Sequence, residues 1–216
     1  MAKTPEPEEV FDVAKRAVVA VGGGRGFIIE ATLYNRLLVR LIVTAAHCLP
    51  HLPPASVISR SEDRTYAGVL GRLTDRKPKV WAECVFADPV ADIAVLATVD
   101  GQELYDEAKA YDELTDDAPV LRIVDAPEQG PGWLLTLDGR WVTCVVRHFG
   151  GPLEISGAAE PIMGGMSGSP ILGADGAAMG VVCSSSGVSG APLTQGFPNP
   201  RLMDNLPGFL LRGIAR

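Results

Sequence analysis

The sequence has no apolar run of about 18 residues or more, the length that a membrane-spanning helix needs. It also has no cluster of basic residues. Its 19 lysines and arginines are outnumbered by 26 aspartates and glutamates, so the net charge is −7. A strongly basic surface is the usual footprint of proteins that bind nucleic acids or anionic membranes. We therefore expect neither nucleic acid nor a membrane as a partner.

Cysteine and histidine are scarce, and no Cys-x-x-Cys pair occurs. A metal site is not expected, because only His47 has a cysteine beside it and the other candidate ligands are scattered. We expect no cofactor either. The amino terminus lacks the apolar stretch of a secretory signal, which favours a cytoplasmic location unless a leader has been removed. In that compartment the four cysteines are expected to be free thiols: Cys48, Cys84, Cys144 and Cys183.

The sequence is rich in turn residues, with 24 glycines and 17 prolines. These residues separate short runs of β-branched and aliphatic residues, such as residues 37–43 and 93–97. Asp138-Gly139 and Asp175-Gly176 are typical of hairpin turns. The pattern predicts an all-β fold with two six-stranded antiparallel β-barrels. Near-helical apolar spacing in residues 200–215 predicts a C-terminal helix.

Four regions are expected along the chain. Residues 1–8 are predicted to be a disordered tail, and residues 9–100 an N-terminal barrel that starts with a short helix running into a strand. Residues 101–117 are acidic and lack a strand pattern, so we interpret them as a surface linker between the two halves. Residues 118–216 are expected to form the second barrel and the C-terminal helix.

The stretch Gly164-Gly165-Met166-Ser167-Gly168-Ser169-Pro170 is a candidate nucleophile turn. A serine hydroxyl attacks a carbonyl only when a base removes its proton and donors hold the resulting oxyanion. The flanking glycines allow close approach of a carbonyl carbon, and they leave the backbone N–H groups of Gly165 and Ser167 free to point at one spot. Taken alone, the same stretch is equally typical of an ordinary glycine-rich loop.

A candidate base and acid stand elsewhere in the chain. His47 follows a buried strand and two alanines, and Asp92 opens the apolar run Ile93–Leu96. A carboxylate at the head of a buried strand is costly unless it is hydrogen-bonded or charge-paired, and an imidazolium is a suitable partner. Each residue alone could be an ordinary structural histidine or turn aspartate, but the order His, Asp, Ser makes that reading improbable for all three together.

These motifs resemble those of the chymotrypsin/trypsin-like serine peptidases. The resemblance rests on Thr44-Ala45-Ala46-His47-Cys48, on Asp92-Ile93-Ala94-Val95-Leu96, and on Gly165 through Pro170, in the family's order and spacing. The Ser-Gly-Ser-Pro ending is similar to bacterial members of the glutamyl-endopeptidase-like and HtrA-like kinds. The resemblance implies that Ser167 is the nucleophile, His47 the general base and Asp92 the orienting acid. It also implies an oxyanion hole built from the N–H groups of Gly165 and Ser167.

The resemblance implies a substrate cleft as well. Cys183-Ser184-Ser185 would pair with the backbone of a protein or peptide substrate. Pro161 and Ile162, with Val182 facing them, would form the floor of the primary specificity pocket. No acid or histidine stands at these positions, which predicts a preference for small or medium apolar side chains. A one-residue shift in the alignment would place Glu160 there and reverse that preference.

Three departures from the family pattern stand out. Cys183 occupies a position that often holds a serine donating to the triad aspartate. Cys48 has no upstream cysteine to bridge it. Met166 replaces the acid that, in many relatives, pairs with a new amino terminus after activation cleavage. The last departure predicts a chain that is active uncut, or one that is controlled by a regulatory protein partner.

Two other functions stay open at this level. The chain could be a catalytically silent pseudoprotease that acts as a protein-binding module, or an esterase that uses the same triad on small acyl substrates. The complete set of triad residues favours a serine endopeptidase over the first. The expected pairing of substrate with residues 183–185 favours peptides over the second.

Overall fold

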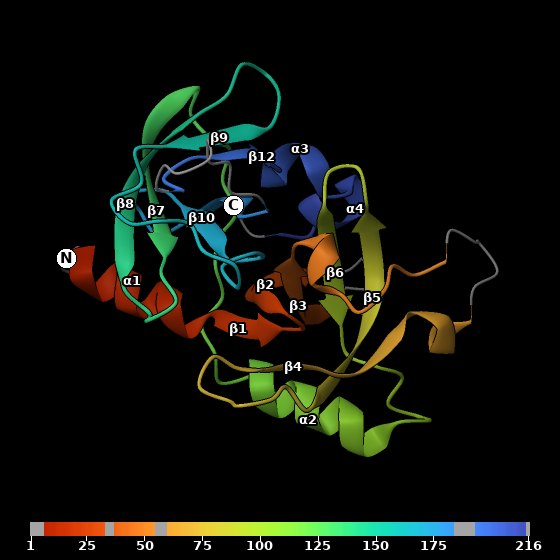
Figure 1. Cartoon of the computed structure of the whole chain (residues 1–216). Coiled ribbons are helices and arrows are strands. Elements are labelled where there is room, and N and C mark those ends of the chain that lie inside the picture. Colours follow the sequence, from red (N-terminus) through yellow and green to blue (C-terminus); the bar gives the residue numbers. More distant parts are fainter. Residues whose placement is uncertain (1–6, 33–36, 55–59, 184–192, 215–216) are drawn as a thin grey trace, which may run out of the picture.

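The computed structural model describes residues 7–32, 37–54, 60–183 and 193–214. The described chain folds into two six-stranded β units with helices packed around them (Figure 1). This arrangement confirms the all-β prediction. The predicted substrate-binding residues Ser184 and Ser185 lie outside the described residues.

The first unit is a closed antiparallel barrel with the strand order β1-β2-β3-β6-β5-β4. It closes because β1 pairs with both β2 and β4. Its interior is filled by aliphatic and aromatic side chains such as Phe27, Ile42 and Leu96, none of which is exposed to solvent. The strands are β1 (Val18–Val21), β2 (Gly24–Thr32), β3 (Leu38–Thr44), β4 (Thr65–Arg72), β5 (Val80–Asp88) and β6 (Ile93–Ala97), with 3-10 turns η1 (Ala46–Cys48) and η2 (Ser61–Arg64).

The second unit is a six-stranded sheet with the order β11-β10-β7-β8-β9-β12. The expected number of strands is present, but the edge strands β11 and β12 do not pair in the described part of the chain, so the sheet curls without closing. Several of its strands span only three or four residues. The six strands of this sheet are β7 (Gln129–Leu135), β8 (Trp141–Arg147), β9 (Leu153–Ser156), β10 (Pro170–Leu172), β11 (Ala178–Val181) and β12 (Gly196–Asn199).

Helix α1 (Pro7–Arg16) precedes the first strand and packs on the second sheet. Phe11 contacts the rings of Trp133 and Trp141 at centroid distances of 5.2 and 5.8 Å. The indole N–H of Trp141 also donates to the carbonyl of Phe11 at 2.9 Å. The amino-terminal helix therefore connects the start of the first barrel to the second sheet.

The acidic segment 101–117 contains helix α2 (Tyr105–Thr115), which we did not predict. Its apolar side is narrow, because only Tyr111 and Thr115 are buried in it. The Tyr111 hydroxyl donates to the carbonyl of Arg40 on β3 at 3.0 Å. The helix packs against β5 and lies along the lower edge of the first barrel in Figure 1.

The C-terminal region forms two short helices rather than the single helix predicted. They are α3 (Leu202–Asn205) and α4 (Gly208–Leu211), and the chain is extended at Leu206 and Pro207 between them. Proline lacks the N–H that would continue the helix and disfavours helical geometry in the residue before it. After α4, Ile214 pairs with Ala31 of β2, so the chain end packs on the first barrel. None of the described helices is long and apolar enough to cross a membrane.

Candidate active site

His47 and Asp92 meet because two paired strands end at the same place. Strands β3 and β6 are antiparallel, with Thr44 opposite Ala94. The chain leaves β3 into η1, which carries His47, and Asp92 immediately precedes β6. The N–H of Ala46 donates to the Asp92 carbonyl at 3.2 Å, which holds the two chain ends together.

Two hydrogen bonds join His47 to the carboxylate of Asp92. The ring Nδ1 lies 2.6 Å from Oδ2, and the backbone N–H of His47 donates to Oδ1 at 2.9 Å. Asp92 has a φ of +57°, in the left-handed region that aspartate tolerates better than most residues. The paired contacts fix the orientation of the ring and leave Nε2 as its unbound nitrogen.

Cys183 also contacts this pair. Its thiol donates at 3.2 Å to the main-chain carbonyl of Asp92. Burial, followed by the nearby charge of Asp92, raises the pKa of the Cys183 thiol far above its ordinary value. The thiol therefore stays protonated and remains a donor.

Ser167 lies in a turn just before β10, and backbone bonds tie this turn to β11 and its extension. Gly168 N–H donates to the Val182 carbonyl at 2.7 Å, and Val182 N–H donates to the Ser169 carbonyl at 2.9 Å. Gly165 and Gly168 have φ values of +91° and +82°, which favour glycine. The glycines on both sides of Ser167 are thus required by the backbone path.

Strand β2 of the first barrel holds the same turn from the other side. The N–H of Arg25 donates to the Ser167 carbonyl at 2.7 Å. The Arg25 carbonyl lies so close to Gly168 that a Cβ there would overlap with it. That carbonyl also accepts a 2.6 Å bond from the Thr44 hydroxyl. The position of the nucleophile turn therefore depends on the first barrel as well as on the second sheet.

The Arg25 side chain forms a further link that sequence reasoning missed. It is buried, and its guanidinium donates to the carbonyls of Leu135 and Thr136 at 2.8 and 3.0 Å. Burial lowers its pKa, and no carboxylate pairs with it among the described residues. A charged residue placed between two glycines at the start of a strand was the one signal available in the sequence.

Several hydrogen-bonding groups of the candidate site have no partner among the described residues. Within the described ranges, no hydrogen bond joins the His47 ring to the Ser167 hydroxyl, and the N–H groups of Gly165 and Ser167 have no protein acceptor. Catalytic hydrogen bonds are often long in the absence of substrate and shorten when it binds. The two N–H groups are thus available to an incoming oxygen.

The residues predicted to form the specificity pocket differ in how far they are exposed to solvent. Ile162 and Val182 are 2% and 1% exposed and pack with Met166 in the core of the second sheet, whereas Pro161 is exposed. Glu160 forms an ion pair with Arg140 at 2.8 Å. Its carboxylate is therefore already engaged by a cation of this chain. Among the described residues, no group of three or more histidine, cysteine or acidic side chains is arranged to hold a metal ion.

Comparisons with known proteins agree with this geometry. Three similar solved structures come from two proteins, one titled a protease and the other a serine endoprotease. The Rv3671c protease in its inactive form is 19% identical to this chain, with a TM-score of 0.53. The match covers 94% of this chain and 97% of that chain. The Ser343Ala mutant of the same protein from M. tuberculosis H37Rv, also in an inactive form, is 18% identical, with a TM-score of 0.50 and coverages of 91% and 88%.

The third structure is the serine endoprotease from Yersinia pestis, which is 16% identical with a TM-score of 0.55, over 91% of this chain and 64% of that one. At these identities the likeness shows the fold. The search of curated protein sequences gave no match.

The family model described as a trypsin-like peptidase domain matches residues 24–181. This span runs from the start of β2 to the end of β11 and includes His47, Asp92 and Ser167. The chain therefore belongs to the trypsin-like peptidase family, and it is a serine peptidase.

Proposed function

We propose that the protein is a serine endopeptidase that cleaves peptide bonds through Ser167, His47 and Asp92. Ser167 Oγ attacks the scissile carbonyl while His47 Nε2 takes its proton. The oxyanion accepts hydrogen bonds from the N–H groups of Gly165 and Ser167. His47 then passes the proton to the leaving amine, and a water molecule activated by the same ring hydrolyses the acyl-enzyme.

The observation that carries this proposal is the double hydrogen bond between His47 and Asp92. A carboxylate that accepts from Nδ1 selects the tautomer in which Nε2 is free to act as a base, and it stabilises the imidazolium that forms during turnover. The second bond, from the backbone N–H of His47, fixes the carboxylate relative to the chain that carries the ring. A pseudoprotease would have no need to keep both contacts.

Met166 supports activity without amino-terminal cleavage. Its side chain is 1% exposed, and its sulfur accepts a 3.2 Å bond from the Met163 N–H. A thioether carries no charge, so a buried ammonium beside it would lack an ionic partner. We therefore propose that the uncut chain is the active species, and that the His47–Ser167 bond forms when substrate or a regulatory protein binds.

The proposed specificity is supported by the absence of a free charge among the described residues at the expected pocket. Glu160 is paired with Arg140, and the neighbouring positions are occupied by Pro161 and Ile162. We propose a preference for small or medium apolar side chains before the cleaved bond. A peptide-library screen checks this, and a profile dominated by arginine and lysine would show that Glu160 is the residue read by the enzyme.

The central test is reaction with a fluorophosphonate, followed by mass analysis of the intact protein and its peptides. We expect one adduct on Ser167 of a chain that has not been shortened. Ser169→Ala is the matched control, because this serine lies two positions away, is fully buried and has no side-chain partner. Labelling confined to shortened chains would contradict activity of the uncut protein, and no labelling at all would favour a binding module. Hydrolysis of nitrophenyl esters without cleavage of casein would favour an esterase.

A further inference from the structure

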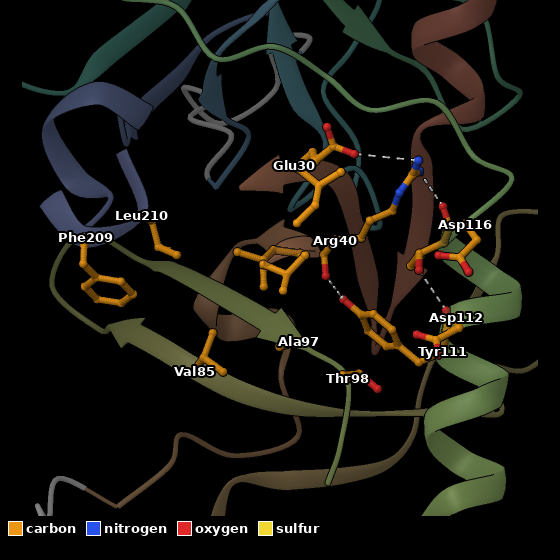
Figure 2. A pocket seen from close by; sticks show the side chains of 14 residues that line it. Glu30, Arg40, Val85, Ala97, Thr98, Tyr111, Asp112, Asp116, Phe209 and Leu210 are labelled. Atoms are coloured by element: carbon orange, nitrogen blue, oxygen red, sulfur yellow. Dashed lines mark hydrogen bonds and ion pairs between the residues drawn. The ribbon is translucent and has the colours of Figure 1, made fainter. Parts of the chain in front are cut away.

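A cavity of about 560 Å³ lies on the first barrel, well away from the residues of the proposed triad. It is bordered by α2 on one side, by α4 on the other, and by strands β3, β5 and β6 between them (Figure 2). Drug-sized ligands occupy pockets of about 300–1,000 Å³, so the volume suits a small molecule.

The cavity is largely apolar. Leu38, Val85 and Phe209 line it although they are 57%, 40% and 52% exposed, so apolar surface remains open to solvent there. Tyr111 contributes its ring, because its hydroxyl is bonded to the carbonyl of Arg40. Exposed apolar side chains grouped around a hollow indicate a binding site more often than isolated ones do.

The side of the cavity formed by α2 is acidic. Asp112 and Asp116 are one helical turn apart, and Figure 2 shows them at the opposite end of the cavity from Phe209 and Leu210. Neither aspartate has an ion-pair partner among the described residues. Partial burial raises the pKa of Asp112, and the neighbouring charge of Asp116 raises it further.

Among the described residues that line the cavity, Arg40 is the cation, and it is already engaged. The Arg40 guanidinium donates to the carbonyls of Thr115, at 2.7 Å, and Ala118, and it lies 3.9 Å from the Glu30 carboxylate. Its charge is thus balanced by Glu30 and by the carboxyl end of α2. The described residues that line the cavity therefore carry a net negative charge, from Asp112 and Asp116.

We propose that this cavity binds a small amphiphilic cation, a ligand with an alkyl or aromatic body and one ammonium or guanidinium group. The apolar body lies between Phe209, Val85 and the ring of Tyr111, and the cationic group faces Asp112 and Asp116. The proposal does not depend on the catalytic assignment. Strands β3 and β6 nevertheless have this cavity at one end, through Leu38 and Ala97, and His47 and Asp92 just beyond the other.

The test is a titration of the full-length protein followed by NMR, with octyltrimethylammonium and octanoate as probes of equal chain length. We expect saturable shifts of residues in α2, α4 and β3 with the cation, and binding of octanoate weaker by about tenfold because each aspartate attracts one probe and repels the other. Equal affinities for the two probes, or shifts that do not saturate, would overturn the proposal.

Two variants locate the charge. Asp112→Asn combined with Asp116→Asn should weaken cation binding by roughly two- to tenfold and should remove most of the preference over octanoate. Asp106→Asn is the matched control, since Asp106 stands on the same helix and is exposed but does not line the cavity. Equal effects of the control and the double variant would show that the aspartates do not recognise the cation.

Discussion

The two halves of the molecule hold their proposed catalytic groups in different ways. His47 and Asp92 follow and precede paired strands of one closed barrel and are joined by two direct hydrogen bonds. Ser167 lies in a turn before a strand of three residues, and part of its support comes from Arg25 of the other half. His47 and Asp92 are therefore assembled within one barrel, whereas the turn that carries Ser167 is held by both halves.

The largest expected effect comes from removing one group from each half. Ser167→Ala and His47→Ala should each lower kcat by roughly 10⁵–10⁶-fold, and the double variant should fall little further, because the residues act as a unit. Turnover of a peptide substrate measures this, with Ser169→Ala as the control. Additive losses in the double variant would mean that the two side chains do not act in one mechanism.

Removing the hydrogen bonds by which Arg25 joins the two halves should lower the stability of the fold. Arg25→Met removes two charge-assisted hydrogen bonds. The Thr136 carbonyl keeps its bond from the Gly139 N–H, but the Leu135 carbonyl loses the donor that the guanidinium supplied, so we expect the free energy of unfolding to fall by about 3 kcal/mol. Activity should fall as well, because β2 holds the nucleophile turn.

Arg122→Met is the control for that experiment, since the Arg122–Asp175 ion pair is half exposed. Such surface pairs contribute about 1 kcal/mol or less. Urea unfolding of both variants makes the comparison. If Arg25→Met loses no more stability than Arg122→Met, the buried guanidinium does not hold the halves together.

Alkaline pH should weaken both halves through their buried thiols. Burial raises the pKa of Cys84 in the first barrel to about 11 and that of Cys144 in the second sheet to about 12. Both thiols are neutral in the folded and unfolded chains below about pH 9, where this contribution to stability is complete. Above that pH only the unfolded chain ionises readily, so stability is lost as pH rises towards the folded values.

We expect the free energy of unfolding to fall by about 3 kcal/mol between pH 9 and 10.5, and Cys84→Ala and Cys144→Ala should each reduce the slope. Urea unfolding at a series of pH values measures it. An unchanged slope in both variants would assign the loss to other groups, such as Tyr66, whose pKa burial raises to about 12.

The smallest effect is expected at Cys183. Cys183→Ser keeps a donor to the Asp92 carbonyl and should change kcat by less than about threefold, whereas Cys183→Ala removes that donor and should lower kcat by roughly three- to tenfold. Steady-state kinetics of the two variants gives the comparison. A larger loss with serine than with alanine would show that the contact with Asp92 is unimportant.

The sequence predicted the β strands well, and it indicated that His47 and Asp92 would be partners, because both inferences depend on local patterns. Apolar runs ending at His47 and starting at Asp92 mark strand ends, and the glycines around Ser167 mark a backbone path that other residues cannot follow. Arg25 could not be found in this way, since its partners Leu135 and Thr136 lie more than a hundred residues away and are main-chain atoms. Helix α2 was missed because its apolar face consists of few residues within a charged segment.

The close approach of Gly168 to the Arg25 carbonyl has a consequence for the newly made protein. The strands of the first barrel are complete by Ala97, and the turn that must fit against β2 is translated only later. Domains synthesised first generally fold first, so the barrel can stand as a template on the ribosome before the nucleophile exists. Under the proposed mechanism, hydrolysis requires the last third of the chain, and a truncated product that ends before Ser167 lacks the nucleophile.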